Sequence, residues 1–534
     1  MLIHAMEGEV KKPMILSFNK YLPLVLILMV FIVVKIPHLS QPHYWDEAWS
    51  YATAVQKMYE GGPTLLPGHI DVDATRGHPL LFYATTATWM KIFGDSLLSK
   101  HSFALLISIL LLVAVYLVSI TLYNLRVAIM ATVLFAAQIF FFVQSSMLLP
   151  EVMVALFFLT SIYFFVSESY VALAVSLTAL YLTKESGLVT GLVLGMVFLL
   201  MIFRKDYAKQ EKLKLFLALL VPGLIIVSFY LIQKLRYGWF FFPDHMGLID
   251  TKLADFPAKF QAMLFVIFME EKRKWLWLMI AAFATFYSIR KNDYKWIYFV
   301  VAIAIIFVFK YATQVEFLKK PIVTIAFMAY ILFLCGKHWL SVARDDRKKH
   351  FIIIAGVFSV AYLVFCAINF YTTRYLTIIL LFSLMAYAVW LEAIFKELSV
   401  KLYLPFAIIF IALSIQLYTN KSDAGWSPYN TLLVQKDIID YLVKVNAQNS
   451  QIGVGSFLQR TNLQNRSCGF IDKQTETFPH VSWDIDSHTD YAIFDNIEPD
   501  NRFEAIKNDP NFELIHQVNK ENFWGVVFRR IKTE

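Results

Sequence analysis

Long apolar segments follow one another through the first 418 residues of this chain, and no other feature limits its possible folds as strongly. A helix needs about 20 apolar residues to cross the hydrocarbon core of a bilayer. Segments approaching that length lie at residues 19–38, 99–123, 127–146, 150–167, 170–183, 186–203, 215–236, 275–289, 296–312, 321–336, 351–369, 375–395 and 402–418. We therefore expect residues 1–418 to form an all-α polytopic membrane domain with about 13 transmembrane helices.

The composition agrees with a chain that lies mostly in lipid. Hydrophobic residues make up 58% of the sequence and charged residues only 16%. In soluble domains, hydrophobic residues make up about 45–50% and charged residues about 25%. From Thr419 onward there are 12 basic and 16 acidic residues, so the formal net charge of +8 comes from the first 418 residues. Because that excess lies in short loops between apolar segments, it is better explained by membrane topology than by nucleic-acid binding.

The distribution of basic residues predicts the orientation of the spans. Basic clusters occur at residues 204–214, 290–295, 344–349 and 396–401. They all fall on one side of the membrane if the spans alternate from a cytoplasmic N-terminus, as the positive-inside rule requires. An odd number of spans then places the C-terminus outside the cytoplasm. The chain has three cysteines and no disulfide framework, which favours a bacterial inner (plasma) membrane.

The first extracytoplasmic loop is predicted at residues 39–98. Within it, residues 80–94 are apolar and aromatic but too short to span, which is typical of a helix lying in the membrane interface. We expect Gly94 to end this helix and Asp95 to cap the next one.

The composition changes beyond residue 418. Residues 436–445 have helical spacing, and short strands are predicted at 452–458, 491–494, 512–515 and 524–528. We therefore expect residues 419–534 to form a small extracytoplasmic α/β domain, which either recognises an acceptor or stabilises the outer face.

Two adjacent carboxylates, Asp46 and Glu47, follow the first apolar segment. Charge at a membrane boundary is costly to retain, but the pair alone fits a functional role and an ordinary solvated loop equally, and the rest of the chain favours the functional role. Neighbouring side chains cannot point the same way, so we expect the two to act differently.

The sequence has no phosphate-binding Gly-rich motif, no dinucleotide fingerprint and no HExxH pair. An ATP-driven pump or a nucleotide-sugar enzyme is therefore disfavoured.

Other polar residues fall on the same predicted face of the membrane. They are His69, Asp71, Asp73, Arg76, His78, Glu151, Lys184, Glu185, Asp244, His245 and Arg374. Each has a simpler explanation: Glu151 could favour a helix N-terminus, Lys184 and Glu185 could form a polar break, and Arg374 could snorkel to the interface. His69, Asp71 and Asp73 could bind a divalent metal ion or belong to an ordinary loop. Together the set supplies a carboxylate to deprotonate a hydroxyl and cations to stabilise a departing phosphate.

At these positions the chain resembles the GT-C membrane glycosyltransferases, in the group of the protein O-mannosyltransferases and the lipid A aminoarabinose transferase (family 39). The matching motifs are Trp45-Asp46-Glu47, Gly77-His78-Pro79-Leu80, Leu149-Pro150-Glu151, Leu182-Thr183-Lys184-Glu185-Ser186-Gly187 and Thr373-Arg374-Tyr375. The sequence departs from the family pattern at three places. Pro79 stands alone where two prolines are common, Glu151 replaces Asp, and Lys100-His101 stands where the second span usually carries Arg.

The resemblance implies a GT-C fold and an inverting transfer of a sugar from a polyprenyl-phosphate donor to an acceptor hydroxyl on the extracytoplasmic face. It implies Asp46 as general base, with Glu47 and Glu151 supporting the site or helping to hold a divalent metal ion. His78, Lys184 and Arg374, with Arg76 and Tyr375 beside them, become candidates for binding the lipid phosphate. The acceptor could be a lipid, a glycan or a protein.

Two other functions remain open from the sequence. A transporter or flippase for a lipid-linked substrate would more often carry broken helices and an internal repeat, and no repeat stands out here. A ligase that moves a whole lipid-linked glycan shares the same donor chemistry.

Overall fold

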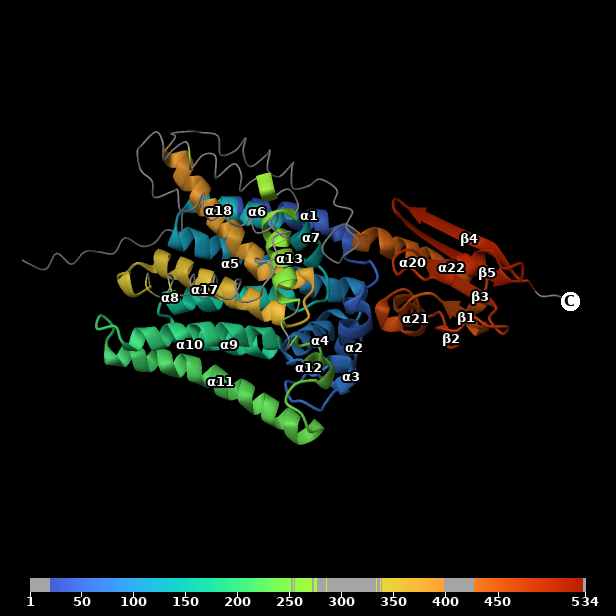
Figure 1. The fold of residues 1–534 in the computed structure, drawn as a ribbon, viewed down its shortest axis with the longest axis horizontal. Coiled ribbons are helices and arrows are strands. Elements are labelled where there is room, and N and C mark those ends of the chain that lie inside the picture. The colour runs from blue at the N-terminus through green and yellow to red at the C-terminus, as the bar shows by residue number, and fades with distance from the viewer. Residues whose placement is uncertain are drawn as a thin grey trace, which may run out of the picture.

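The computed structural model describes residues 20–250, 253, 255–270, 273–275, 285, 333, 337, 339–397 and 427–531. It shows a helical bundle beside a smaller α/β domain (Figure 1). The spans predicted at 275–289, 296–312, 321–336 and 402–418 fall almost entirely outside the described residues, as does the predicted domain boundary at 418/419. The number of transmembrane helices therefore stays a prediction.

The bundle consists of apolar helices of very different lengths. Its main helices are α1 (Leu22–Lys35), α4 (Leu81–Phe93), α5 (Leu97–Leu122), α6 (Leu125–Ala136), α7 (Ile139–Gln144), α8 (Glu151–Val166), α9 (Tyr170–Thr183), α10 (Leu188–Ile202), α11 (Lys209–Tyr237), α13 (Phe256–Phe268), α17 (Arg347–Ile368) and α18 (Thr377–Glu397). In the described part of the chain, five helical stretches are long and apolar enough to cross a membrane: Leu97–Leu122, Glu185–Ile202, Lys209–Tyr237, Arg347–Ile368 and Thr373–Ala393. The protein is accordingly a multi-pass membrane protein.

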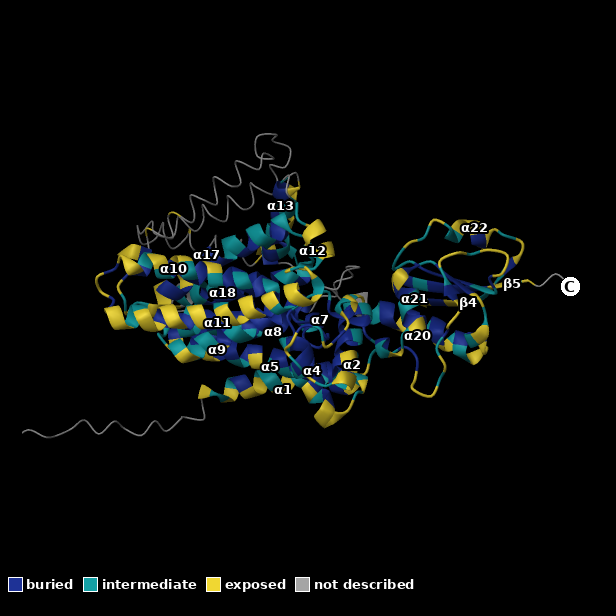
Figure 2. Cartoon of the chain, turned by 90° about the horizontal axis from the view of Figure 1, so that it is seen from below, coloured by how far each residue is buried: buried dark blue, intermediate teal, exposed yellow. Residues whose placement is uncertain are grey.

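Helix α11 is exposed along much of its length (Figure 2), and many of its exposed residues are apolar. Leu220, Leu224 and Leu235 are 38%, 56% and 85% exposed. A soluble protein would bury such a surface, whereas lipid tails solvate it without cost.

The single span predicted at 127–146 is wrong: the structure breaks it into α6 and α7. Gln138 lies between the two helices with an extended backbone, and its side chain donates to the Leu134 carbonyl at 3.1 Å. Its amide oxygen accepts from Arg273 Nη1 at 2.8 Å, a contact across 135 positions of sequence. The break is stabilised by this distant arginine, which local hydropathy does not reveal.

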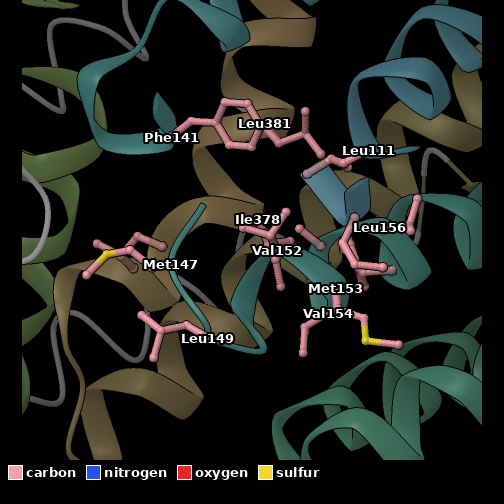
Figure 3. Packing of buried hydrophobic residues seen from close by; sticks show 14 of the residues in the cluster. Leu111, Phe141, Met147, Leu149, Val152, Met153, Val154, Leu156, Ile378 and Leu381 are labelled. Atoms are coloured by element: carbon pink, nitrogen blue, oxygen red, sulfur yellow. The ribbon is translucent and has the colours of Figure 1, made fainter. Parts of the chain in front are cut away.

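Helix α8 runs through the apolar core. Val152 and Met153 lie among Leu111 of α5, Ile378 of α18 and other buried side chains (Figure 3). Met153 is 3% exposed and Ile378 2%. Glu151, the first residue of α8, is therefore fixed by the helix packed behind it.

The two ends of the bundle differ in chemistry. Glu168, just beyond the end of α8, pairs with Arg344 at 2.5 Å, and Arg204 donates to the Trp339 carbonyl at 3.0 Å. The loops at 204–214 and 344–349 thus lie at the end of the bundle opposite Glu151. Two of the four basic clusters share one end, as the alternation predicts, while the orientation in the membrane stays a prediction.

The loop after α1 is largely helical. A π-helical turn at Glu47–Tyr51 continues into α2 (Ala52–Gly61), and α3 (Val72–Thr75) precedes α4. Gly94 ends α4 with φ 86°, as predicted. The prediction of Asp95 as the next cap is wrong, because the Ser96 side chain accepts from the Ser99 amide at 3.2 Å.

The C-terminal domain is a five-stranded sheet in the order β2-β1-β3-β5-β4. The strands are β1 (Ile452–Val454), β2 (Val481–Ser482), β3 (Tyr491–Asp495), β4 (Phe512–Lys520) and β5 (Phe523–Arg530), and the helices are α20 (Ser427–Lys444), α21 (Phe457–Gln464) and α22 (Phe503–Lys507). Strand β1 is parallel to β2 and β3, whereas β5 is antiparallel to β3 and β4. The strand predicted at 452–458 is too long, because Ser456 caps α21 by accepting from the Gln459 amide.

This domain contacts the first loop directly. Lys473 pairs with Asp95 at 2.5 Å, and Asn465 donates to the Thr53 hydroxyl at 2.8 Å. Gly469 has φ 85°, and a Cβ there would lie 2.5 Å from Leu97 Cδ2. Glycine suits this position, because other residues rarely adopt this φ and a Cβ would press on the Leu97 side chain of α5.

Candidate functional site

The adjacent carboxylates Asp46 and Glu47 point in different directions, as predicted. Trp45, just before them, has φ 48°, a costly conformation for a bulky residue. The π-helical turn begins at Glu47, and such turns often occur at functional sites. Asp46 is partly exposed and pairs with Arg374, and its Oδ1 accepts from the Trp49 indole at 3.1 Å.

Glu47 is buried behind Asp46. Its Oε1 lies 2.9 Å from His43 Nδ1 and 2.8 Å from His101 Nε2, and accepts from the Leu148 amide at 2.6 Å. Burial alone would raise the pKa of Glu47, but the two imidazoles hold it well below its ordinary value. Burial lowers the pKa of His43 to about 4. Glu47 thus joins the loop to α5, behind Asp46.

The sequence analysis did not identify His43 and His101 as site residues. One indication was available for His101, which stands where the family resemblance expects an arginine. His43 lies four residues before Glu47, and only the three-dimensional structure shows that the two side chains meet.

Arg374, Glu151 and Lys184 extend the charges from Asp46 into the bundle. Arg374 Nε lies 3.2 Å from Glu151 Oε1, and Lys184 Nζ lies 2.8 Å from the same oxygen. All three side chains are buried, and Glu151 Oε2 has no hydrogen-bond partner among the described residues. Asp46, Arg374, Glu151 and Lys184 therefore form a continuous row of ion pairs in which negative and positive charges alternate, although some of them are more than 300 positions apart in the sequence. Arg374 is 3% exposed, so it is not a snorkelling anchor.

A second group of polar side chains surrounds Glu185. His78 Nδ1 lies 2.8 Å from Glu185, and His245 Nδ1 lies 3.8 Å from it. Arg76 lies beside this group, with its guanidinium 5.1 Å from the Trp49 ring and 3.9 Å from Asp244. His245 therefore faces the same site as His78 and Glu185.

Both groups meet a cavity of about 750 Å³, which is within the range of ligand sites. Its polar lining includes Asp46, Arg76, His78, Lys184, Glu185, His245 and Arg374. Its apolar lining includes Leu188 and Leu192 of α10 and Phe365 of α17. Leu192 is 64% exposed, so the apolar wall continues onto the outer surface of the bundle. Tyr375 also lines the cavity, with Lys184 Nζ 4.2 Å from its ring centroid.

Two sets of three side chains among the described residues place possible metal ligands within 4.8 Å of one another. They are His43, Glu47 and His101, which are buried, and His78, Glu185 and His245, which are partly exposed. The candidates His69, Asp71 and Asp73 do not form such a set. His69 contacts the Gly61 carbonyl at 2.8 Å, and Asp71 pairs with Lys57 at 3.0 Å.

No family model and no curated protein matches the sequence. A structure of ArnT from Cupriavidus metallidurans bound to undecaprenyl phosphate is similar with a TM-score of 0.43 and 14% identity, over 94% of this chain and 97% of that one. A second similar structure is that of the oligosaccharyltransferase AglB from Archaeoglobus fulgidus in complex with an inhibitory peptide and a dolichol phosphate. It has a TM-score of 0.45 and 12% identity, over 87% of this chain and 62% of that one. An Archaeoglobus fulgidus oligosaccharyltransferase in complex with Zn and sulfate has a TM-score of 0.46 and 11% identity, over 88% of this chain and 67% of that one. Similarities this distant assign no activity to this chain.

Proposed function

We propose that this protein is a membrane glycosyltransferase that moves a sugar from a polyprenyl-phosphate donor to an acceptor hydroxyl, with inversion at the sugar carbon. One observation carries this proposal: the carboxylate of Asp46 and the cations of Lys184 and Arg374 line one cavity whose apolar wall continues onto the lipid-facing surface. A lipid tail can then remain among apolar side chains while its phosphate and sugar occupy the polar part.

Asp46 is the proposed general base. It takes the proton of the acceptor hydroxyl while that oxygen forms a bond to the anomeric carbon of the sugar. The bond from this carbon to the phosphate oxygen breaks, and the lipid phosphate leaves with the electron pair. Asp46 is held in place by Arg374 and by the Trp49 indole.

The leaving phosphate requires positive charge. Lys184 and Arg374 already neutralise Glu151, so a bound phosphate would share cations that are fixed before it arrives. Arg76 and His78 line the same cavity and add donors. Glu151 then holds the cations, and Glu47 supports the turn that carries Asp46.

The test uses purified protein in lipid nanodiscs with a radiolabelled polyprenyl-phosphate sugar and acceptor-containing membrane extract. We expect Asp46→Asn to reduce transfer at least about 100-fold, because a general base contributes on the order of 10²–10⁴. Asp440→Asn, on the 56% exposed side chain of α20, is the control. Full transfer by Asp46→Asn would refute the assignment of the base.

The same assay separates the other two functions. A transporter or flippase would move the labelled lipid without breaking the sugar–phosphate bond. A glycan ligase would transfer a preassembled oligosaccharide and leave a single-sugar donor intact.

We also propose that His78, Glu185 and His245 hold a divalent metal ion. Two imidazole nitrogens and a carboxylate oxygen suit Zn²⁺ and similar transition metals. Such an ion would add positive charge at the cavity where the phosphate leaves. We expect elemental analysis of the purified protein to find a divalent metal that His245→Ala removes. Equal metal content in His245→Ala and Asp440→Asn would contradict this site.

A further inference from the structure

A row of aromatic rings leads from the cavity onto the C-terminal domain. We call Trp49, Phe457 and Trp483 the aromatic strip. The Trp49 and Phe457 ring centroids are 5.6 Å apart in an edge-to-face arrangement, and those of Phe457 and Trp483 are 6.4 Å apart with an interplanar angle of 17°. The three rings come from the first loop, the first turn of α21 and the segment after β2. The fold therefore gathers them from widely separated parts of the sequence.

The outer rings of the strip are not part of a core. Phe457 is 45% exposed and Trp483 36%. Helix α21 already buries its other face through Leu458 and Leu463, so its packing does not require the Phe457 ring. Large apolar side chains exposed together at a surface are candidates for a binding site.

The inner end of the strip reaches the proposed general base. Trp49 lines the cavity and donates its indole N–H to Asp46 Oδ1 at 3.1 Å. Helix α21 packs against the π-helical turn that carries Trp49, and Figure 1 shows α21 on the side of the C-terminal domain that faces α2. A molecule lying on Phe457 and Trp483 could therefore present one end at Asp46.

The chemistry of the strip favours sugar rings. The faces of aromatic rings are electron-rich, and one face of a pyranose presents slightly positive C–H groups. Arg460, whose guanidinium lies 5.9 Å from the Trp483 ring, can donate to hydroxyl groups at the rim. The rings belong to the loop and the C-terminal domain, outside the membrane-spanning helices, so they suit the water-facing part of an acceptor.

We propose that the aromatic strip binds the acceptor and that this acceptor is a glycan. The proposal rests on the function proposed above and adds the substrate class of the same site. A glycan stacked on Trp483 and Phe457 would run along the strip toward Trp49 and place a terminal hydroxyl beside Asp46.

The test measures binding of the full-length protein in nanodiscs to an array of bacterial-envelope oligosaccharides. We expect Phe457→Ala and Trp483→Ala each to weaken binding by on the order of tenfold, because each removes a ring face on which a sugar would stack. Trp483→Phe, which keeps a ring, should retain more binding than Trp483→Ala. Leu514→Ala is the matched control, since it removes a 50% exposed side chain from β4 at the opposite edge of the sheet.

The glycan proposal is overturned if the array shows no binding, if both alanine variants bind as the wild type does, or if a peptide array binds in place of the glycans. Cleavage of the labelled lipid donor by the wild type is measured separately. Donor cleavage without strip-dependent glycan binding refutes the acceptor assignment alone. Strip-dependent glycan binding without any donor cleavage refutes the glycosyltransferase and leaves a glycan-binding surface.

Discussion

At the scale of single residues, the local backbone decides what each carboxylate does. Trp45 with φ 48° and the π-helical turn after it separate Asp46, which faces the cavity, from Glu47, which faces His43 and His101. The sequence indicated that the two would act differently, because neighbouring side chains diverge. It did not indicate which one would be buried, since that depends on α5 packing behind the loop.

Another buried carboxylate, Asp495 at the end of β3, makes the C-terminal domain sensitive to pH. Its Oδ2 accepts from Gln459 at 2.7 Å, yet burial outweighs this bond and raises its pKa to about 6. The folded state therefore binds the proton more tightly than the unfolded chain, whose aspartate titrates near 3.9. This contribution to stability is complete below about pH 4 and is lost as the pH rises through 6.

We expect the domain to lose about 2 kcal/mol of unfolding free energy between pH 4 and pH 7, since each pKa unit corresponds to about 1.4 kcal/mol. Asp495→Asn, which cannot ionise, should lose most of this dependence. Hydrogen exchange of the β3 amides at pH 4 and pH 7 measures this loss, with rates corrected for intrinsic exchange. The same pH dependence in Asp495→Asn would show that another group is responsible.

At the scale of elements, a contact between Gly469 and the Leu97 side chain joins the C-terminal domain to the bundle. Gly469 has φ 85°, and a Cβ at this position would lie 2.5 Å from Leu97 Cδ2 at the start of α5. Apolar periodicity placed α5, and turn chemistry predicted Gly94, but neither showed that the two parts of the chain meet here.

We expect Gly469→Ala to loosen this junction, because the substitution adds a steric clash to the backbone strain. Gly238→Ala is the control, since Gly238 also has φ 85° but a Cβ there meets nothing within 4 Å. Limited proteolysis of the nanodisc-bound protein should cut between the bundle and the C-terminal domain faster in Gly469→Ala than in Gly238→Ala. Equal cleavage would mean that strain alone accounts for the effect.

At the scale of the whole molecule, the cavity and two of the basic loops lie at opposite ends of the bundle. If the positive-inside rule orients this bundle, the cavity and the C-terminal domain lie outside the cytoplasm. We expect an alkaline phosphatase fused after residue 534 to be active and a green fluorescent protein fused there to be dark. A fluorescent C-terminal fusion would reverse the predicted orientation and place the cavity in the cytoplasm.

The sequence by itself indicated most of the membrane helices within the described residues, the presence of a small α/β domain after them and most of the polar residues that line the cavity. It could do so because hydropathy, helix ends and ionisable residues at membrane boundaries are local properties. The tertiary structure decided which of these residues meet: Arg374 bridges Asp46 and Glu151, His245 joins His78 and Glu185, and Gln138 breaks a span by contacting Arg273. These contacts join residues up to 328 positions apart, and their geometry follows from how the helices pack, which no local pattern in the chain contains.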